Sequence, residues 1–123
     1  MKLNDLYTVE NHEDGAELQI KDENGKKTPL WLTVKGTDSL TYRNELKKQK
    51  TAYVEASRND KTLDTDNFVI DTLVASTSGW RGTDEEFSKE LCRELYENAP
   101  FVKEQVDDFM TERKNFTKAK PKK

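Results

Sequence analysis

The feature that most constrains this chain is a pair of short runs in which apolar and polar residues alternate, one on each side of an Asn-Gly pair. Every second residue is apolar in 16–20 and again in 30–34, which is the period of a strand with one buried face. Asn24-Gly25 lies between the two runs, and this pair readily takes the positive φ angles of a tight hairpin turn. The pattern therefore predicts a β-hairpin over residues 16–35.

A hairpin of two strands is marginally stable in water, so this one needs a further partner. We expect it to pack on the helices, to gain a third strand from residues 2–8, or to pair with another chain. Its strand edges, with little nearby to cover them, predict a weak homo-oligomer. The other residues before the hairpin are polar and end in a turn or loop at 11–15.

From Gly36 onward the apolar spacing changes to that of helices, and we expect four of them. The first begins at Thr37 or Asp38 and ends near Arg58, and the second covers roughly 64–77. A loop over 78–82 follows the second helix.

The third predicted helix begins with Thr83-Asp84-Glu85-Glu86, in which a threonine and a glutamate have the spacing of a capping box. The fourth begins at Pro100, because proline suits a first helical turn. The side chains expected to line up along these helices are Phe87, Leu91 and Leu95 in the third, and Val102, Val106, Phe109, Met110 and Arg113 in the fourth.

The predicted fold class is α+β, with an N-terminal β-hairpin (three strands if residues 2–8 add one) followed by a four-helix C-terminal region. We assign residues 1–116 to a single α+β domain, with the hairpin at 16–35 and the helical part at 37–116. The Lys-rich tail, 117–123, is expected to be disordered.

Composition predicts a small hydrophobic core and a location inside the cell. Only 33% of the 123 residues are hydrophobic and 37% are charged, so much of the chain must face water. No apolar run is long enough to cross a bilayer or to act as a signal peptide. The chain has one cysteine, which excludes an internal disulfide framework. We expect a cytoplasmic protein with no membrane partner.

The sequence offers no catalytic, cofactor-binding or metal-binding site. The one histidine, His12, stands in a polar loop without the neighbouring ligands that a metal needs, and we expect an ordinary surface residue. Cys92 has no histidine base nearby, and the surrounding glutamates would raise the pKa of its thiol, so we expect buried filler. The chain is predicted not to be an enzyme.

Nucleic acid is not the expected partner either. The first helix and the tail are basic, and such residues can neutralise phosphates. The whole chain nevertheless has a net charge of −3, and no nucleic-acid reading motif accompanies the basic residues. A solvated helix face and a solubilising tail explain these charges.

Aromatic residues in unusual places point to protein binding. Trp31 falls on the polar side of its predicted strand, and Trp80 stands in a loop bounded by Gly79 and Gly82. Each is either a partly buried cap on the core or an anchor for a partner. Phe101 lies off the apolar face of its helix, where it either packs under the corner at 98–100 or binds a partner protein. The protein-binding candidates are Trp31, Trp80, Arg81, Phe87, Phe101 and Phe109.

Several short motifs resemble the tail assembly chaperones of long-tailed bacteriophages. Residues 72–82 read TLVASTSGWRG, and FSKEL follows at 87–91. Further along come the helix-breaking Pro100, the segment FVKEQV at 101–106 and the pair Asn115-Phe116. Upstream, WLTVKGTDS at 31–39 is also similar to phage proteins of this type.

The resemblance implies a non-virion protein that acts in the host cell cytoplasm. Such a protein binds the tape measure protein, keeps that long helical client soluble and helps tail tube subunits assemble around it, with no catalytic residues or cofactor. The alternative is a structural head–tail connector, neck or minor tail protein that stays in the virion. A regulatory protein that binds a host enzyme is a third hypothesis.

Overall fold

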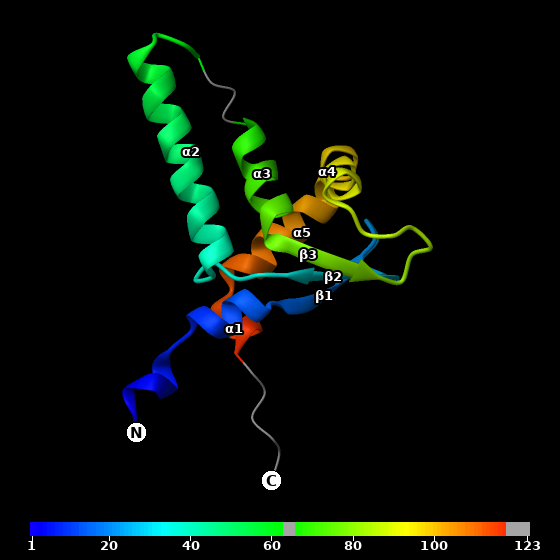
Figure 1. Cartoon of the computed structure of the whole chain (residues 1–123). Coiled ribbons are helices and arrows are strands. Elements are labelled where there is room, and N and C mark those ends of the chain that lie inside the picture. Colours follow the sequence, from blue (N-terminus) through cyan, green and yellow to red (C-terminus); the bar gives the residue numbers. More distant parts are fainter. Residues whose placement is uncertain (63–65, 118–123) are drawn as a thin grey trace.

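The computed structural model describes residues 1–62 and 66–117, and it is an α+β structure built around one antiparallel sheet. The strands are β1 (Ala16–Lys21), β2 (Lys27–Val34) and β3 (Thr77–Arg81), in the order β1-β2-β3 (Figure 1). The helices are η1 (Leu3–Leu6), α1 (Val9–Asp14), α2 (Leu40–Arg58), α3 (Asp66–Ser76), α4 (Lys89–Asn98), α5 (Pro100–Thr111) and η2 (Arg113–Phe116), where η marks a 3-10 helix.

The predicted hairpin is confirmed, but its turn differs in detail. β1 pairs with β2 so that Leu18 lies opposite Leu32. Gly25 has a φ of 82°, whereas Asn24 is not among the residues with positive φ, so the tight two-residue turn is wrong. Instead the Asp22 carboxylate accepts hydrogen bonds from the backbone N–H of Asn24 (2.9 Å) and of Lys26 (3.0 Å). A side chain therefore closes a wider turn.

The third strand comes from a segment that the sequence predicts to be a loop. Residues 77–81 form β3, which places Trp80 opposite Leu32, while residues 3–6 form a 3-10 helix and add no strand. The strand was hidden because it is short, contains Gly79 and follows α3 without any turn signal. The backbone N–H of Lys35 also donates to the carbonyl oxygen of Ser76 (2.8 Å), so pairing continues past the end of β2.

Several predicted helix boundaries are corrected. Ser39 caps α2, since its hydroxyl accepts from the backbone N–H of Tyr42. The capping box at 83–86 does not start a helix: Ser88 caps α4, and residues 82–88 form a loop. α5 ends at Thr111, before Arg113. The short helix α1 was not predicted.

The core lies between the sheet and the helices α3, α4 and α5. In α5 the predicted inward residues Val102, Val106 and Met110 are buried. In α4 the inward face was wrong by one position, because Cys92 and Tyr96 are buried whereas Leu91 and Leu95 are half-buried. The other buried members of the core are Ile20, Leu32 and Val34 from the sheet and Leu73 and Val74 from α3.

His12 is not a surface residue, contrary to the sequence prediction. α1 carries it against the segment that follows β2, where only 2% of it is exposed. Its Nδ1 accepts a hydrogen bond from the backbone N–H of Asp38 (3.0 Å), and its ring stacks on Phe116 at 4.8 Å. A Cβ at Gly36 would overlap the His12 ring, so a glycine is required at that approach. His12 thus joins α1 and η2 to the segment that follows β2.

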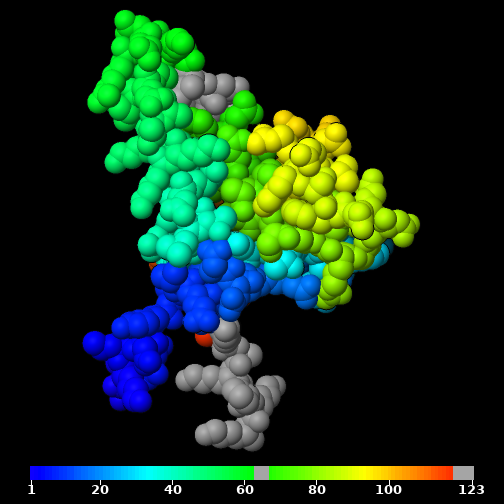
Figure 2. Space-filling model, viewed as in Figure 1, coloured from blue at the N-terminus to red at the C-terminus, as the bar shows by residue number. Residues whose placement is uncertain are grey.

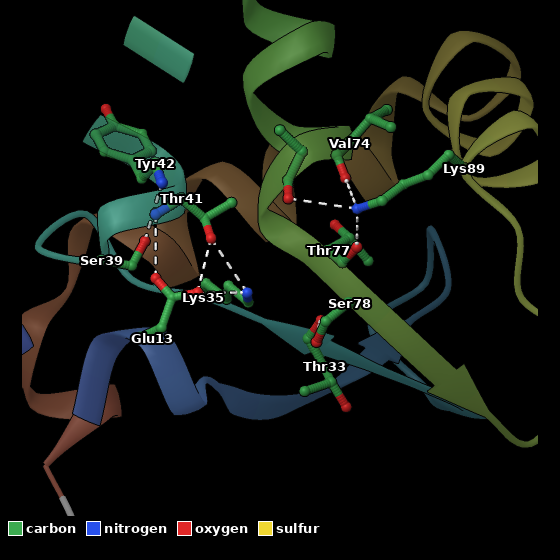
Figure 3. Close-up of polar contacts among 11 residues, drawn as sticks. Glu13, Thr33, Lys35, Ser39, Thr41, Tyr42, Val74, Thr77, Ser78 and Lys89 are labelled. Carbon is green, nitrogen blue, oxygen red and sulfur yellow. Dashed lines mark hydrogen bonds and ion pairs between the residues drawn. The ribbon is translucent and has the colours of Figure 1, made fainter. Parts of the chain in front are cut away.

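A polar cluster joins α1 to the start of α2. The Glu13 carboxylate accepts from the ammonium of Lys35 and from the hydroxyl (2.7 Å) and backbone N–H (3.0 Å) of Thr41 (Figure 3). These hydrogen bonds, led by that of Lys35, lower the pKa of Glu13 to about 2.

We call α2 with the first part of α3 (residues 66–72) the arm, and the sheet with α4 and α5 the body. Figure 2 shows α2 standing away from the body at the upper left. Among the described residues of α2, only Ala56 is buried. Within the described parts of the chain, no helix is both long and apolar enough to span a membrane. Most of the predicted disordered tail, 118–123, lies outside the described residues.

Candidate binding pocket beside Trp80

The position of Trp80 is set first by the junction at which α3 becomes β3. The ammonium of Lys89 donates to the carbonyl oxygens of Val74 (2.8 Å), Ala75 (3.3 Å) and Thr77 (2.7 Å), as Figure 3 shows. These oxygens stand at the end of α3, where carbonyls have no partner within the helix. A cation there also suits the helix dipole. One side chain therefore ties the start of α4 to the point where the strand begins.

The junction is reinforced by a buried hydroxyl pair. The hydroxyls of Tyr96 and Thr77 lie 2.6 Å apart, and the Thr77 hydroxyl donates to the carbonyl oxygen of Leu73 (2.7 Å). Because the tyrosine is buried, its pKa is raised. The phenol therefore stays neutral and structural.

The chain bends at Gly82, directly after β3, and enters the loop over residues 82–88. The φ of Gly82 is 91°, and a Cβ there would collide with the carbonyl oxygen of Pro29, so only glycine fits. The following loop is fixed by the indole, whose Nε1–H donates to the carbonyl oxygen of Glu85 (2.8 Å). Phe87 meets the Trp80 ring edge to face, with centroids 5.0 Å apart. The indole is thus half-buried and acts as a cap on the core.

One side of that cap borders an open pocket of about 410 Å³. Its walls are mainly apolar, and its polar groups are one hydroxyl and two carboxylates. The lining residues are Leu30, Trp80, Thr83, Glu85, Leu91, Glu94 and Leu95. A pocket of this kind suits an apolar side chain, and its carboxylates favour a neighbouring cation on that partner. Both readings of Trp80, core cap and wall of a binding surface, are therefore compatible with its place.

Trp31 and Arg81 lie elsewhere, on the opposite face of the sheet. They are cross-strand partners, and the guanidinium carbon of Arg81 stands 4.6 Å from the centre of the Trp31 ring. Arg81 also pairs with Glu17 across β2, with its Nε 2.8 Å from a carboxylate oxygen. This hydrogen bond lowers the pKa of Glu17 and raises that of Arg81. Arg81 is therefore engaged within its own chain and is not directed at the pocket.

Phe101 and Phe109 form a third location, on α5 beside β1. Both line an open groove with Leu18, and Phe109 also packs edge-on against Phe116 at 5.5 Å. The amide of Gln105 bonds the backbone of Lys21 twice, accepting from its N–H (2.9 Å) and donating to its carbonyl (2.8 Å). That side chain occupies part of the β1 edge.

The six predicted binding residues are thus divided in pairs among three places: Trp80 with Phe87, Trp31 with Arg81, and Phe101 with Phe109. Cys92 is buried as predicted, and burial is the main cause that raises the pKa of its thiol. The sequence predicts the raised pKa of Cys92 but attributes it to nearby glutamates, whereas burial is its largest cause. Among the described residues, no group of three or more metal-ligand side chains lies together.

A further groove was missed by the sequence reasoning. It lies between α2, α3 and the end of α5, has a volume of about 220 Å³, and we call it the arm groove. Its lining residues are Thr37, Tyr42, Leu46, Gln49, Phe68, Val69, Thr72, Leu73, Asp107, Met110 and Thr111. The available signal was in α2, where Tyr42, Leu46, Gln49 and Tyr53 follow one another at helical spacings of four and three.

Comparison with known protein families, with curated proteins and with solved structures finds no match to this chain.

Proposed function

We propose that this chain is a non-enzymatic tail assembly chaperone of a long-tailed phage, which binds the tape measure protein in the host cytoplasm. The observation that carries the proposal is the open apolar pocket beside Trp80, with Leu30, Leu91 and Leu95 in its walls. A chaperone for a long helical client needs such a surface, because it must cover apolar side chains that would otherwise aggregate.

The location of the family-like motifs supports this proposal. Residues 72–82 end α3 and form β3, and residues 87–91 lead into α4. These are the elements that place Trp80 and Leu91 in the pocket. The part of the chain that resembles tail assembly chaperones is therefore also the part that builds the candidate surface.

The proposed action is capture of an apolar client residue by the pocket. Glu85 and Glu94 at its rim favour client segments that carry a lysine or arginine beside that residue. By covering such residues, the chaperone keeps the tape measure protein soluble until tail tube subunits replace it. Because the edge strands of the sheet can pair with another copy of the chain, a weak homo-oligomer stays a prediction.

The experiment is a co-expression pull-down with the tape measure protein, using Leu91→Ser as the test variant. Leu91 lines the pocket and is only half-buried, so its loss should leave the fold intact, as circular dichroism would verify. Leu3→Ser is the matched control, because Leu3 is 74% exposed and is distant from Leu91 in the sequence. We expect Leu91→Ser to weaken client binding by about thirtyfold or more, the scale of an anchor residue.

Two results would contradict the proposal. If folded Leu91→Ser binds the client as tightly as the parent does, the pocket is not the binding surface. If the parent does not bind the tape measure protein, the chaperone role is excluded. Mass spectrometry of purified virions tests the alternative, because a head–tail connector stays in the particle at stoichiometric amounts whereas a chaperone does not.

A further inference from the structure

Several large apolar side chains of α2 are exposed to solvent. The residues that face α3 are small or polar, and Gln49 makes the connection by donating to the carbonyl oxygen of Phe68 (3.1 Å) and the hydroxyl of Thr72 (2.8 Å). Two larger apolar residues of the helix stay open to solvent beside that contact: Leu46 is 41% exposed and Tyr53 is 56% exposed. A helix with this pattern buries little within its own chain, although Tyr42, Leu46 and Tyr53 form an apolar stripe along one side of it, with Gln49 between them.

The stripe continues across the arm groove onto α3. Leu46 and Val69 line opposite sides of the groove, and Val69 is 47% exposed. The floor is made by Leu73 and Met110, which are buried core residues. The groove is therefore firm at its base and open along α2.

A basic stripe runs parallel to the apolar one. Arg43, Lys47 and Lys50 are four and three residues apart, so they lie along one side of α2, next to Leu46 and Tyr53. All three are exposed, and none forms an ion pair within the part of the chain that the structure describes. The helix holds five basic and two acidic residues in a chain with a net charge of −3.

From this arrangement we infer that the arm groove binds an acidic amphipathic helix of another protein. The spacing from Tyr42 to Tyr53 matches the side-chain spacing with which one helix receives another. The basic stripe beside it selects a partner helix whose flank carries glutamate or aspartate. Nucleic acid would use the cations but would leave the apolar stripe uncovered. This inference concerns a different surface from the Trp80 pocket and does not depend on the chaperone proposal.

The occupant can be identified with a displayed library of helical peptides in which apolar positions and flanking charges vary independently. Selection should enrich peptides with apolar residues at i, i+3 or i+4, and i+7, flanked by acidic residues. A chosen acidic peptide and its copy with lysine in place of each acidic residue are then compared by fluorescence anisotropy. We expect the acidic peptide to bind at least tenfold more tightly at low salt, and the difference to shrink as salt rises.

Three variants locate the peptide on the protein. Leu46→Ser and Val69→Ser should each weaken binding by about tenfold or more, whereas Leu3→Ser should not, since Leu3 is a still more exposed apolar residue away from the arm. The combined change Arg43→Glu, Lys47→Glu and Lys50→Glu should reverse the preference toward the lysine peptide. Because all these side chains are surface residues, circular dichroism should match that of the parent.

Other outcomes would overturn the inference. A library that enriches no helical pattern, or peptides whose binding ignores Leu46→Ser and Val69→Ser, would show that the groove takes no such helix. Sedimentation in which the parent forms dimers that Leu46→Ser abolishes would make a second copy of this chain the occupant. Binding of an oligonucleotide that the charge reversal abolishes and Leu46→Ser leaves unchanged would make nucleic acid the occupant of the basic stripe.

Discussion

The body and the arm bury very different kinds of side chain. In the body, Leu32, Val34 and Val106 are fully buried, and the hydroxyl of Tyr96 is paired with that of Thr77. In the arm, the contact between the two helices depends on an amide, that of Gln49, while Leu46 stays exposed. The body is therefore held by apolar burial, and the arm mainly by its connection to the body.

The difference separates two roles. A packed core resists change because its side chains fill space without voids. A helix with few buried contacts opens at a lower free energy and can gain contacts when a partner binds. We therefore expect substitutions in the body to change stability, and substitutions in the arm to change mainly binding.

The largest expected effect is at Gly82 in the body. Gly82→Ala forces a side chain onto the carbonyl of Pro29 at a backbone φ of 91°, so we expect a loss of about 3–5 kcal/mol in unfolding free energy. Gly25→Ala is the matched control, because Gly25 has a φ of 82° but a Cβ there meets nothing within 4 Å. Denaturant unfolding should give about 1 kcal/mol for the control, and equal losses would show that the collision does not matter.

The second prediction compares one leucine from each region. Leu32→Ala removes a side chain with 0% exposure from the central strand, and it should cost about 2–5 kcal/mol. Leu46→Ala removes one with 41% exposure from the arm, and it should cost less than about 1 kcal/mol. Thermal melts of both variants measure the contrast, and similar losses would end the distinction between body and arm.

The third prediction concerns His12, which lies beside the body. Its Nδ1 accepts a hydrogen bond from Asp38, so the neutral ring carries its proton on Nε2, 3.7 Å from the Asp38 carboxylate. Burial lowers the pKa of His12 below 6.5, an effect that Asp38 opposes and Arg113 assists. The unfolded chain therefore binds the proton more tightly, and stability is complete above about pH 6.5 and falls as the pH drops below that value.

Melting curves from pH 7.5 to 5 should show this decline in the parent. The loss of one buried hydrogen bond sets its scale at roughly 1 kcal/mol. His12→Gln should show a flatter profile over the same range, and an equally steep profile in that variant would exclude His12. A second decline is expected below about pH 4.5, because the pKa values of Glu13 and Asp38 are both lowered to about 2 by their hydrogen bonds.

Much of the fold could be predicted because long segments repeat one period. The hairpin and the helices at 40–58 and 100–111 follow their apolar spacing over many residues. β3 could not be found in this way, since five residues that include Gly79 carry too short a pattern. The strand exists because Trp80 and its neighbours pair with β2, which is a tertiary effect.

The errors at individual residues have the same origin. His12 was placed on the surface because its neighbours in sequence are polar, but its burial depends on Gly36 and Phe116 far along the chain. The aromatic candidates were identifiable by type, whereas their division among three places required the sheet. The arm groove was missed because its two walls come from separate helices.

The smallest effect expected is in the hydrogen exchange of α2. If the two helices of the arm are held together mainly by Gln49, then Gln49→Ala should remove the bonds to Phe68 and Thr72 and lower global stability by less than about 1 kcal/mol. Amide exchange in α2 beyond that position should nevertheless become faster, because the end of the helix has little else to hold it. Exchange in β2 should stay unchanged, since the central strand opens only when the whole body unfolds. Lys103→Ala in α5 provides a control of similar side-chain length in the body. Exchange that accelerates equally in α2 and β2 would mean that the chain unfolds as one unit, and the arm would then have no independent motion for a partner to suppress.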